Sequence, residues 1–318
     1  MNLGKEYEFL NTNPLLGDNI ILLGLGGSKA YGTDTPFSDT DIRGIATRTA
    51  YNILSDTRFD QVIDNPTDTT IYSLEKVINL LTNCNPNVIE ILGLRPQDYL
   101  IIGKYGRMLL DNRKLFLSKR AARTFTGYAT AQLRKIESKT NREDRYADRA
   151  KLTKHQMHLF RLYLMAEDIF EKEEIITYRE KDHDLLMSIR NGDYLGQDNM
   201  PTSTFQKMVA DEEEKLRKLV EKSSLPEHPD GKRIKELLYN INSDIVRNDF
   251  DGEYFNRETN RTEPLTPIRD YMVNPYIPPW GYYKEAITIP QNCRYCSNHP
   301  SNGGSGICHC IMGLPSIT

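Results

Sequence analysis

Long apolar runs, an excess of one charge and scattered cysteines are all missing from this chain. Its 41 basic residues nearly balance its 44 acidic ones, and the net charge of -3 excludes a general attraction to nucleic acid or to a membrane surface. No stretch has the length and apolarity of a membrane span, and the first residues, MNLGKEYEFLNTNPLL, do not have the pattern of a signal peptide. We therefore expect a soluble, cytoplasmic protein whose contacts with RNA or DNA, if it makes any, are local.

Cysteine is almost absent until the end of the chain, where four of the five cysteines gather. The four are Cys293, Cys296, Cys308 and Cys310. They form a Cys-x-x-Cys pair and a Cys-x-Cys pair across a polar, glycine-rich loop, and four thiolates so arranged suit a tetrahedral zinc ion. His299 or His309 could replace one thiolate, and disulfides would need an oxidising compartment. The sequence thus predicts a structural Zn²⁺ site whose four ligands leave no open position for catalysis.

The chemistry of the chain is concentrated in residues 19–47, NIILLGLGGSKAYGTDTPFSDTDIRGIAT. Residues 20–23 are continuously apolar and predict a buried strand, and the glycines that follow allow a tight turn and a close approach to a ligand. Ser28 adds a hydroxyl group. Asp39 and Asp41 lie two residues apart beside an apolar run, so strand alternation predicts that both carboxylates point to one face. Such oxygen ligands suit Mg²⁺ or Mn²⁺, and the backbone N–H groups of the turn suit phosphate.

Taken in this order, GGSKAYGT and SDTDIRG resemble the active-site signature of the DNA polymerase β-like nucleotidyltransferase superfamily, in particular its branch of bacterial and phage predicted nucleotidyltransferases. In that superfamily a third carboxylate on a neighbouring strand completes a site for two metal ions. The resemblance implies that Asp39 and Asp41 bind both ions, and that Asp68 binds the catalytic ion and helps to deprotonate the attacking hydroxyl. Asp60 and Asp64 compete for the third position, but their stretch, DQVIDNPTD, is more typical of a loop than of a strand.

Four further residues are expected to bind the nucleotide. Gly27 and Ser28 would hold its terminal phosphates. Lys29 and Arg43 flank the carboxylates and could bind the triphosphate, Arg43 through its planar guanidinium group and Lys29 as a point charge. Either cation could equally well be an ion-pair partner of the nearby aspartates.

The resemblance extends over residues 19–245 and includes Glu90 in NPNVIEIL and the pair His158 and Arg161. These three residues could line the cleft, and His158 and Arg161 could bind the base or the acceptor. Each also has a structural interpretation. Glu90 could be a helix carboxylate near a positive helix N-terminus, and His158 could be a buried histidine that is hydrogen-bonded to its neighbours.

The pattern of elements predicts an α+β fold, in which a small mixed-sheet nucleotidyltransferase domain is followed by an α-helical domain and a short zinc-binding tail. Residues 1–115 would form the catalytic domain and residues 116–250 the helical domain, whose apolar residues recur at helical spacing. Residues 251–291, rich in proline, tyrosine and asparagine, would form an extended arm that leads to the tail, residues 292–318. A cleft between the first two domains would bind the ligands.

The resemblance therefore implies a metal-dependent nucleotidyltransferase that moves a nucleoside monophosphate from a nucleoside triphosphate, with ATP favoured, to a hydroxyl group and releases pyrophosphate. An RNA 3′ end, a protein hydroxyl or a small alcohol would all suit as acceptor. One alternative is a catalytically idle nucleotide-binding module whose tail recruits a partner, although a complete set of three aspartates argues against it. Another is a nucleotidyltransferase component of a toxin–antitoxin or phage defence system.

Overall fold

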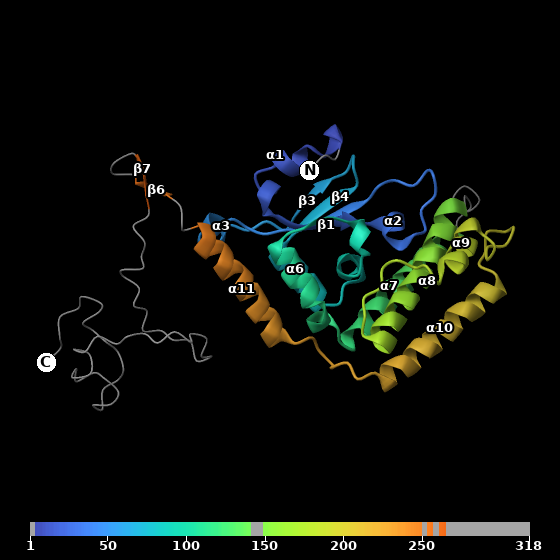
Figure 1. The fold of residues 1–318 in the computed structure, drawn as a ribbon. Coiled ribbons are helices and arrows are strands. Elements are labelled where there is room, and N and C mark those ends of the chain that lie inside the picture. The colour runs from blue at the N-terminus through green and yellow to red at the C-terminus, as the bar shows by residue number, and fades with distance from the viewer. Residues whose placement is uncertain (1–3, 141–148, 250–252, 257–260, 265–318) are drawn as a thin grey trace, which may run out of the picture. The chain divides into compact units, whose positions relative to one another are not determined.

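The computed structural model describes residues 4–140, 149–249, 253–256 and 261–264, drawn in Figure 1. The chain divides into two compact units, Met1–Arg247 and Asn248–Thr318. The strands are β1 (Ile20–Leu25), β2 (Ile42–Ala46), β3 (Gln61–Asp64), β4 (Thr69–Ser73), β5 (Tyr99–Ile102), β6 (Glu253–Asn256) and β7 (Arg261–Pro264). The α-helices are α1 (Phe9–Thr12), α2 (Gly27–Tyr31), α3 (Ala50–Leu54), α4 (Leu74–Thr82), α5 (Pro86–Ile89), α6 (Lys104–Asp111), α7 (Arg120–Thr140), α8 (Arg149–Lys172), α9 (His183–Asn191), α10 (Ser203–Lys222) and α11 (Gly231–Asp249). Short 3-10 helices cover Lys5–Tyr7, Gly17–Asn19, Glu90–Leu92, Pro96–Asp98 and Arg113–Phe116.

The first unit is built on a five-stranded sheet with the strand order β3-β4-β2-β1-β5. Strands β2 and β4 run parallel, with Ile42 opposite Thr69, and the other neighbouring strands run antiparallel. The sheet is therefore mixed, and together with the helices it confirms the predicted α+β class. Strand β5 and helix α6 have no counterpart among the elements expected from the sequence.

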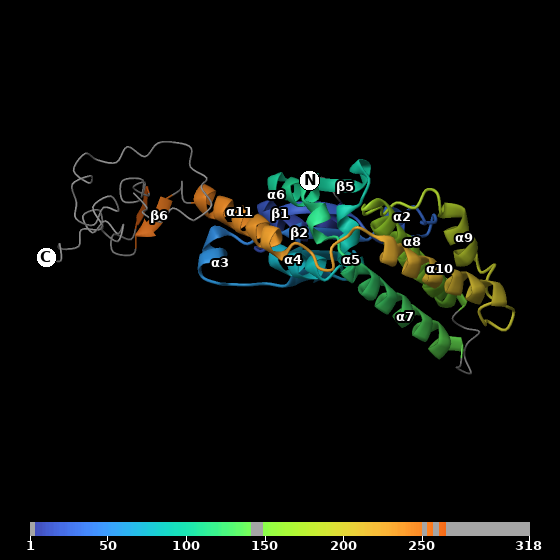
Figure 2. The same cartoon turned by 90° about the horizontal axis from the view of Figure 1, so that it is seen from below.

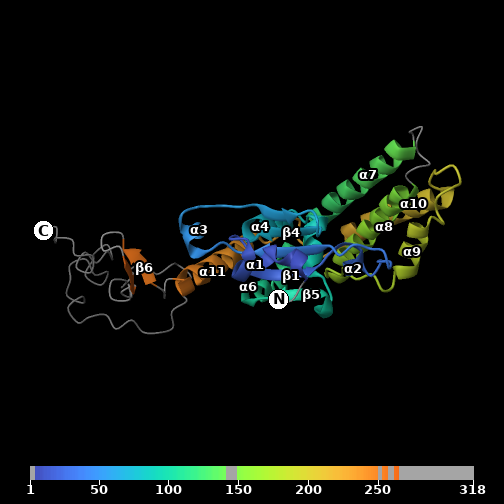
Figure 3. The ribbon, with the colours of Figure 1, turned by 90° about the horizontal axis from the view of Figure 1, so that it is seen from above.

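Strand β1 is buried from both sides, which explains its continuous apolar run. Ile20 and Leu23 pack with Leu10 of α1 in one hydrophobic cluster, whereas Ile21 and Leu22 belong to the main core. A shift of register between Ile20 and Leu22 in the pairing with β2 fits this change of sides. Helices α1 and α6 lie on opposite faces of the sheet (Figures 1 and 3). The strand predicted from this run is confirmed.

Helix α8 is the centre of the helical part and packs against α7, α9 and α10 (Figures 1 and 2). Its residues from Leu152 to Phe170 are buried almost continuously, as expected for a helix that has neighbours on several sides. The predicted helices within residues 116–250 are confirmed in α7, α8, α10 and α11. No helix among the described residues has both the length and the apolar character that crossing a membrane requires.

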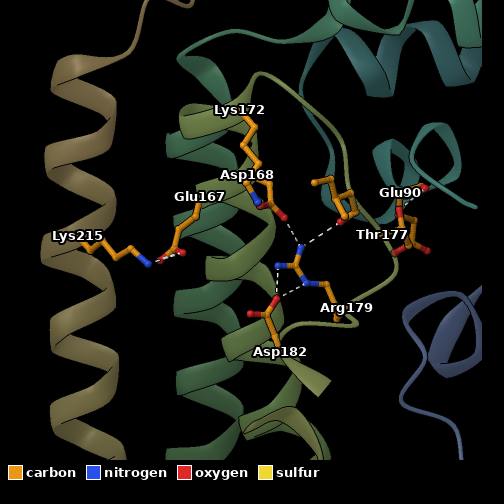
Figure 4. Close-up of polar contacts among 9 residues, drawn as sticks. Glu90, Glu167, Asp168, Lys172, Thr177, Arg179, Asp182 and Lys215 are labelled. Atoms are coloured by element: carbon orange, nitrogen blue, oxygen red, sulfur yellow. Dashed lines mark hydrogen bonds and ion pairs between the residues drawn. The ribbon is translucent and has the colours of Figure 1, made fainter. Parts of the chain in front are cut away.

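The connection between α8 and α9 is pinned to α8 by a buried ion pair between Arg179 and Asp168, each about 6% exposed in its side chain (Figure 4). Asp182 also pairs with Arg179, and Lys172 lies 2.6 Å from Asp168. The same connection reaches the sheet half of the unit, because the Thr177 hydroxyl donates to the Glu90 carbonyl oxygen at 2.7 Å. The connection, held to α8 by the ion pair, thus joins the helical half to the sheet half.

In the second unit, β6 and β7 pair antiparallel, with Glu253 opposite Pro264. The rest of the expected arm at residues 251–291, and the four cysteines of the predicted Zn²⁺ site, lie outside the described residues. The arm and the zinc site therefore stay predictions, as does the domain boundary near residue 115.

Candidate active site

The glycine-rich turn between β1 and α2 lies directly against one of the predicted carboxylates. Gly27 has a positive φ of 55°, and a Cβ atom on it would lie 1.7 Å from Asp41 Oδ2. The backbone N–H of Gly26 donates to the Asp41 carbonyl oxygen at 2.8 Å. Glycine is therefore required at position 27 both for its conformation and for the space that the Asp41 carboxylate fills.

Asp41 and Asp68 meet because two parallel strands begin side by side. Asp41 directly precedes β2, Asp68 directly precedes β4, and the first residues of these strands are paired. We had expected alternation along a strand to align Asp39 with Asp41, but β2 begins only at Ile42, so both residues precede the strand. The pairing between the first residues of β2 and β4 therefore brings the carboxylates of Asp41 and Asp68 together.

A single guanidinium group lies between the two carboxylates. Arg43 Nη2 lies 3.4 Å from Asp41 Oδ1 and 3.3 Å from Asp68 Oδ1, and Arg43 Nη1 donates to the Asp68 carbonyl oxygen at 2.6 Å. Burial, and then the hydrogen-bonded carboxylate of Asp68, raise the pKa of Asp41 to about 6. The pKa of Asp68 is lowered, mainly by its hydrogen bond with Asp41 and also by Arg43. Below about pH 6 the pair therefore shares one proton, which resides on Asp41.

Five of the predicted residues line one cavity of about 450 Å³. They are Gly27, Ser28, Asp39, Asp41 and Asp68. Asp39 thus faces the same cavity as Asp41 and Asp68, although it does not directly precede either of the paired strands β2 and β4. The volume is within the range of small-molecule sites in proteins.

Lys29, Arg43 and the two competitors of Asp68 lie elsewhere. Lys29 donates to the Thr40 hydroxyl, and neither Lys29 nor Arg43 lines the cavity. Asp60 pairs with Lys76 at 2.8 Å, and Asp64 accepts from the Thr67 hydroxyl at 2.7 Å.

Neither competitor of Asp68 faces the cavity. The expectation of a loop at this position is wrong for residues 61–64, which form β3 because they pair with β4. A short edge strand such as β3 forms because a neighbouring strand pairs with it, and the turn-forming residues around it do not predict that pairing.

Another part of the cavity lining comes from helices α7, α8 and α9. Its polar members include Lys135, Lys154, His155, His158, Arg161 and Arg190, and none of the cavity residues on these helices is acidic. Only His158 and Arg161 were indicated by sequence. The sequence around the two lysines, His155 and Arg190 does not indicate that they line a cavity, because a charged residue on a helix face is most often simply exposed to solvent. Phe37, 94% exposed, lines the cavity from the loop before Ser38.

His158 and Arg161 are linked to Glu90 through Tyr31. Arg161 Nη2 lies 2.7 Å from His158 Nδ1, and its guanidinium carbon lies 3.4 Å from the centre of the Tyr31 ring. The Tyr31 hydroxyl donates to Glu90, whose pKa is raised chiefly by burial. Glu90 is about 7% exposed and does not line the cavity. It supports Tyr31, whereas His158 and Arg161 reach the cavity.

Divalent metal ions are implied by the resemblance, and the carboxylates can be tested for their fit. Among the described residues, no group of three or more His, Cys, Asp or Glu side chains is close enough to hold a metal ion. Asp41 and Asp68, however, offer only oxygen atoms and lie within hydrogen-bonding distance of each other. An Mg²⁺ or Mn²⁺ ion prefers such donors and, like the Arg43 cation, would relieve the repulsion between the two carboxylates. The pair fits the ion, with Asp39 facing the same cavity.

A mixed sheet that presents a glycine–serine turn and paired aspartates to a cleft is the architecture of the DNA polymerase β-like nucleotidyltransferase superfamily. The chain belongs, within that superfamily, to the RNA repair pathway DNA polymerase beta family, RlaP, whose sequence model matches residues 5–240. The superfamily resemblance is thereby confirmed. No curated protein matches the chain.

Proposed function

We propose that this protein is a metal-dependent nucleotidyltransferase that transfers a nucleoside monophosphate from a nucleoside triphosphate to a hydroxyl group of RNA, with release of pyrophosphate. The observation that carries the proposal is the meeting of the Gly27–Ser28 turn with Asp39, Asp41 and Asp68 in one cavity. The family is described by a role in RNA repair, which favours RNA over a protein or a small alcohol as the acceptor. ATP is the expected nucleotide.

Asp41 and Asp68, together with Asp39, would hold the Mg²⁺ or Mn²⁺ ions. Bound there, such ions neutralise phosphate charge and stabilise the attacking and leaving oxygens. Asp68, the more acidic member of the pair, is ionised at neutral pH and can accept the proton of the attacking hydroxyl. Arg43 keeps both carboxylates oriented, since it contacts each of them through one nitrogen.

The turn before α2 would bind the triphosphate. Ser28 lines the cavity, and its hydroxyl makes no hydrogen bond to another described residue. Free backbone N–H groups in a tight turn bind phosphate oxygens well. Because neither Lys29 nor Arg43 lines the cavity, positive charge for the phosphates has to come from the metal ions.

The proposal is tested with the full-length protein and four α-labelled NTPs in Mg²⁺ or Mn²⁺. The acceptor is a short single-stranded RNA that ends in a 3′-hydroxyl, with the same RNA blocked by a 3′-phosphate as the negative control. We expect label to be transferred only to the free 3′-hydroxyl. Asp41→Asn and Asp68→Asn should lose several orders of magnitude in rate, because each removes an expected metal ligand and Asp68 also accepts the proton.

Asp60→Asn is the matched control, because Asp60 is exposed, pairs only with Lys76 and does not line the cavity. It should retain wild-type transfer. Transfer that survives Asp41→Asn would show that the carboxylate site is wrong. Binding of NTP without any transfer by the wild-type protein would instead support the idle nucleotide-binding module.

A further inference from the structure

The helical side of the cavity has a polar surface that the proposed transfer of a nucleotide does not yet use. We call it the basic wall and define it as Lys135 on α7 with Lys154, His155, His158 and Arg161 on α8. Lys154 is close enough to the carboxylates to lower the pKa of both Asp41 and Asp68. Among the described residues, neither lysine side chain has an ion-pair or hydrogen-bond partner. The wall therefore carries positive charge that is available to a ligand.

His158 is fixed as a neutral hydrogen-bond donor. The nitrogens of Arg161 can only donate, so His158 Nδ1, at 2.7 Å from Arg161 Nη2, must accept, and the ring proton has to reside on Nε2. Burial, and then the positive charges of Arg161, His155, Lys135 and Lys154, lower the pKa of His158 to about 3. The ring thus offers an N–H to the cavity at neutral pH but does not take up a proton.

Arg161 is held in place but incompletely satisfied. Its guanidinium group stacks on Tyr31 and donates to His158, while its Nε is buried and has no hydrogen-bond partner in the described part of the chain. The residue is about 9% exposed. A buried N–H without a partner costs free energy, on the order of 1 to 3 kcal/mol. Arg161 and His158 together therefore favour a ligand rich in acceptor oxygens, and the lysines require that ligand to be anionic.

We propose that the basic wall binds the two backbone phosphates of the acceptor RNA that lie nearest its 3′-terminal nucleotide. This inference rests on the proposed function, in which RNA supplies the attacking hydroxyl. In an in-line displacement the attacking and leaving oxygens lie on opposite sides of the transferred phosphorus. With the leaving pyrophosphate on the side of the Gly27–Ser28 turn, we place the acceptor strand along the wall, which lines the same cavity from α7 and α8. Lys154 holds the phosphate nearest the carboxylates and Lys135 the next one.

The low net charge of the chain agrees with such a short contact. With a net charge of -3, the molecule as a whole does not attract RNA, so affinity depends on a few local cations. A strand held by two lysines should show a shallow dependence on salt, because each neutralised phosphate of a single strand contributes a slope of about 0.7 in log K against log salt.

The test measures binding of a fluorescent single-stranded RNA by anisotropy over a salt series, and separately measures binding of NTP without RNA. The double variant Lys135→Met with Lys154→Met should bind RNA about tenfold more weakly or worse, with the salt slope reduced by about 1.4. His158→Leu should weaken RNA binding about fivefold, whereas His158→Gln, whose amide offers a donor near the position of Nε2, should stay close to wild type. Affinity for NTP should change less than twofold in all of them.

Arg134→Met is the matched control, because Arg134 is exposed on α7 next to Lys135 but does not line the cavity. It removes one positive charge and should leave RNA affinity unchanged. Both wall lysines are also exposed, so the double variant should remain folded even if a change at His158 does not.

Unchanged RNA affinity in the double variant, or no binding of RNA by the wild-type protein, would overturn the proposal. So would an equal loss of NTP affinity without RNA, because the wall would then belong to the triphosphate. These binding measurements need no turnover and therefore separate the two proposals. If the wild-type protein transfers no nucleotide but the double variant binds RNA more weakly than the wild type, only the proposed function is contradicted. If the wild-type protein transfers a nucleotide to RNA but the double variant binds RNA equally well, only the role of the wall is contradicted.

Discussion

At the scale of single residues, the absence of a side chain at Gly27 decides where a carboxylate can lie. The Asp41 carboxylate occupies the space that any other residue would fill with its Cβ, and the backbone there has a positive φ. A substitution at this position therefore acts on the site through Asp41, and its effect can be distinguished from a general loss of stability.

Gly27→Ala should reduce nucleotidyl transfer by about a hundredfold or more, since displacement of a positioned group by about 1 Å can have an effect of this size. The strained backbone should also lower the free energy of unfolding by about 1 to 3 kcal/mol. Transfer kinetics and urea unfolding measure the two effects. Gly127→Ala in α7 is the control, because a Cβ there meets nothing within 4 Å. It should stabilise the protein by about 0.5 to 1 kcal/mol and leave transfer intact.

Ser28→Ala tests the phosphate-binding turn. Loss of one hydrogen bond to a charged phosphate should weaken NTP binding by about 1 to 2 kcal/mol, and the corresponding nucleoside monophosphate should be affected less. Calorimetric titration with both ligands measures the difference. An equal loss for the two nucleotides would point to a distorted turn and not to a lost phosphate contact.

At the scale of elements, the connection between α8 and α9 depends on the buried ion pair of Arg179 with Asp168 (Figure 4). Asp168→Ala leaves the buried guanidinium group with Asp182 as its one carboxylate partner among the described residues and should lower the free energy of unfolding by about 3 kcal/mol. Lys172→Met, which removes the more exposed partner of Asp168, should cost less than about 1 kcal/mol. Urea unfolding compares them. Equal costs would show that the buried pair does not hold the connection.

Helices α8 and α10 are joined by two carboxylates and one lysine, and this contact should respond to pH. Lys215 lies 2.6 Å from Glu167 and 3.9 Å from Glu212. Burial, and then the neighbouring Glu167, raise the pKa of Glu212 to about 8. The folded protein therefore keeps a proton that the unfolded chain releases above about pH 4.5. Its stabilising contribution is fully present below that pH and is lost as the pH rises through 8.

The free energy of unfolding of the wild-type protein should therefore fall between pH 5 and pH 8 relative to Glu212→Gln, with a slope of less than about 1.4 kcal/mol per pH unit because Glu212 is only partly buried. Glutamine keeps a donor for Glu167 at every pH. Glu214→Gln on the same helix is the control, since the pKa of Glu214 is lowered to about 2 by Arg217 and Lys218 and does not titrate in this range. If the free energy of unfolding of the wild type and of Glu212→Gln changed with pH in parallel, Glu212 would not keep a proton in the folded protein.

At the scale of the whole molecule, the family match ends at residue 240, before the four clustered cysteines begin. The described cavity lies entirely in the first unit, Met1–Arg247. The predicted zinc ion would therefore serve to fold the tail, where the few apolar residues nearby cannot offset the entropy of ordering.

Elemental analysis of the purified protein should show about one zinc per chain. Changing Cys293 and Cys308 to serine should release the metal, while NTP binding in the cavity and the main unfolding transition should survive. Four freely alkylated thiols without bound metal would exclude the site. Loss of all NTP binding on removal of zinc would show that the tail takes part in the active site.

The sequence by itself determined the parts of this protein that depend on neighbours along the chain. The apolar run before the glycines predicted β1, and helical spacing predicted the helices within residues 116–250 that the structure shows as α7, α8, α10 and α11. Gly27, Ser28, Asp39 and Asp41 could be named because their chemistry and order are local to the motif. These features need no partner element to be recognised.

Only the tertiary structure decided which distant groups meet. It paired the starts of β2 and β4 and so placed Asp68 beside Asp41, and it added β5 to the sheet through pairing with β1. It also assigned Arg43 to both carboxylates and brought Lys135 and Lys154 to the cavity. A lysine on a helix face has the same local sequence whether it faces water or a carboxylate. Its role follows from helix packing and strand pairing, which arise from contacts between residues far apart in the chain.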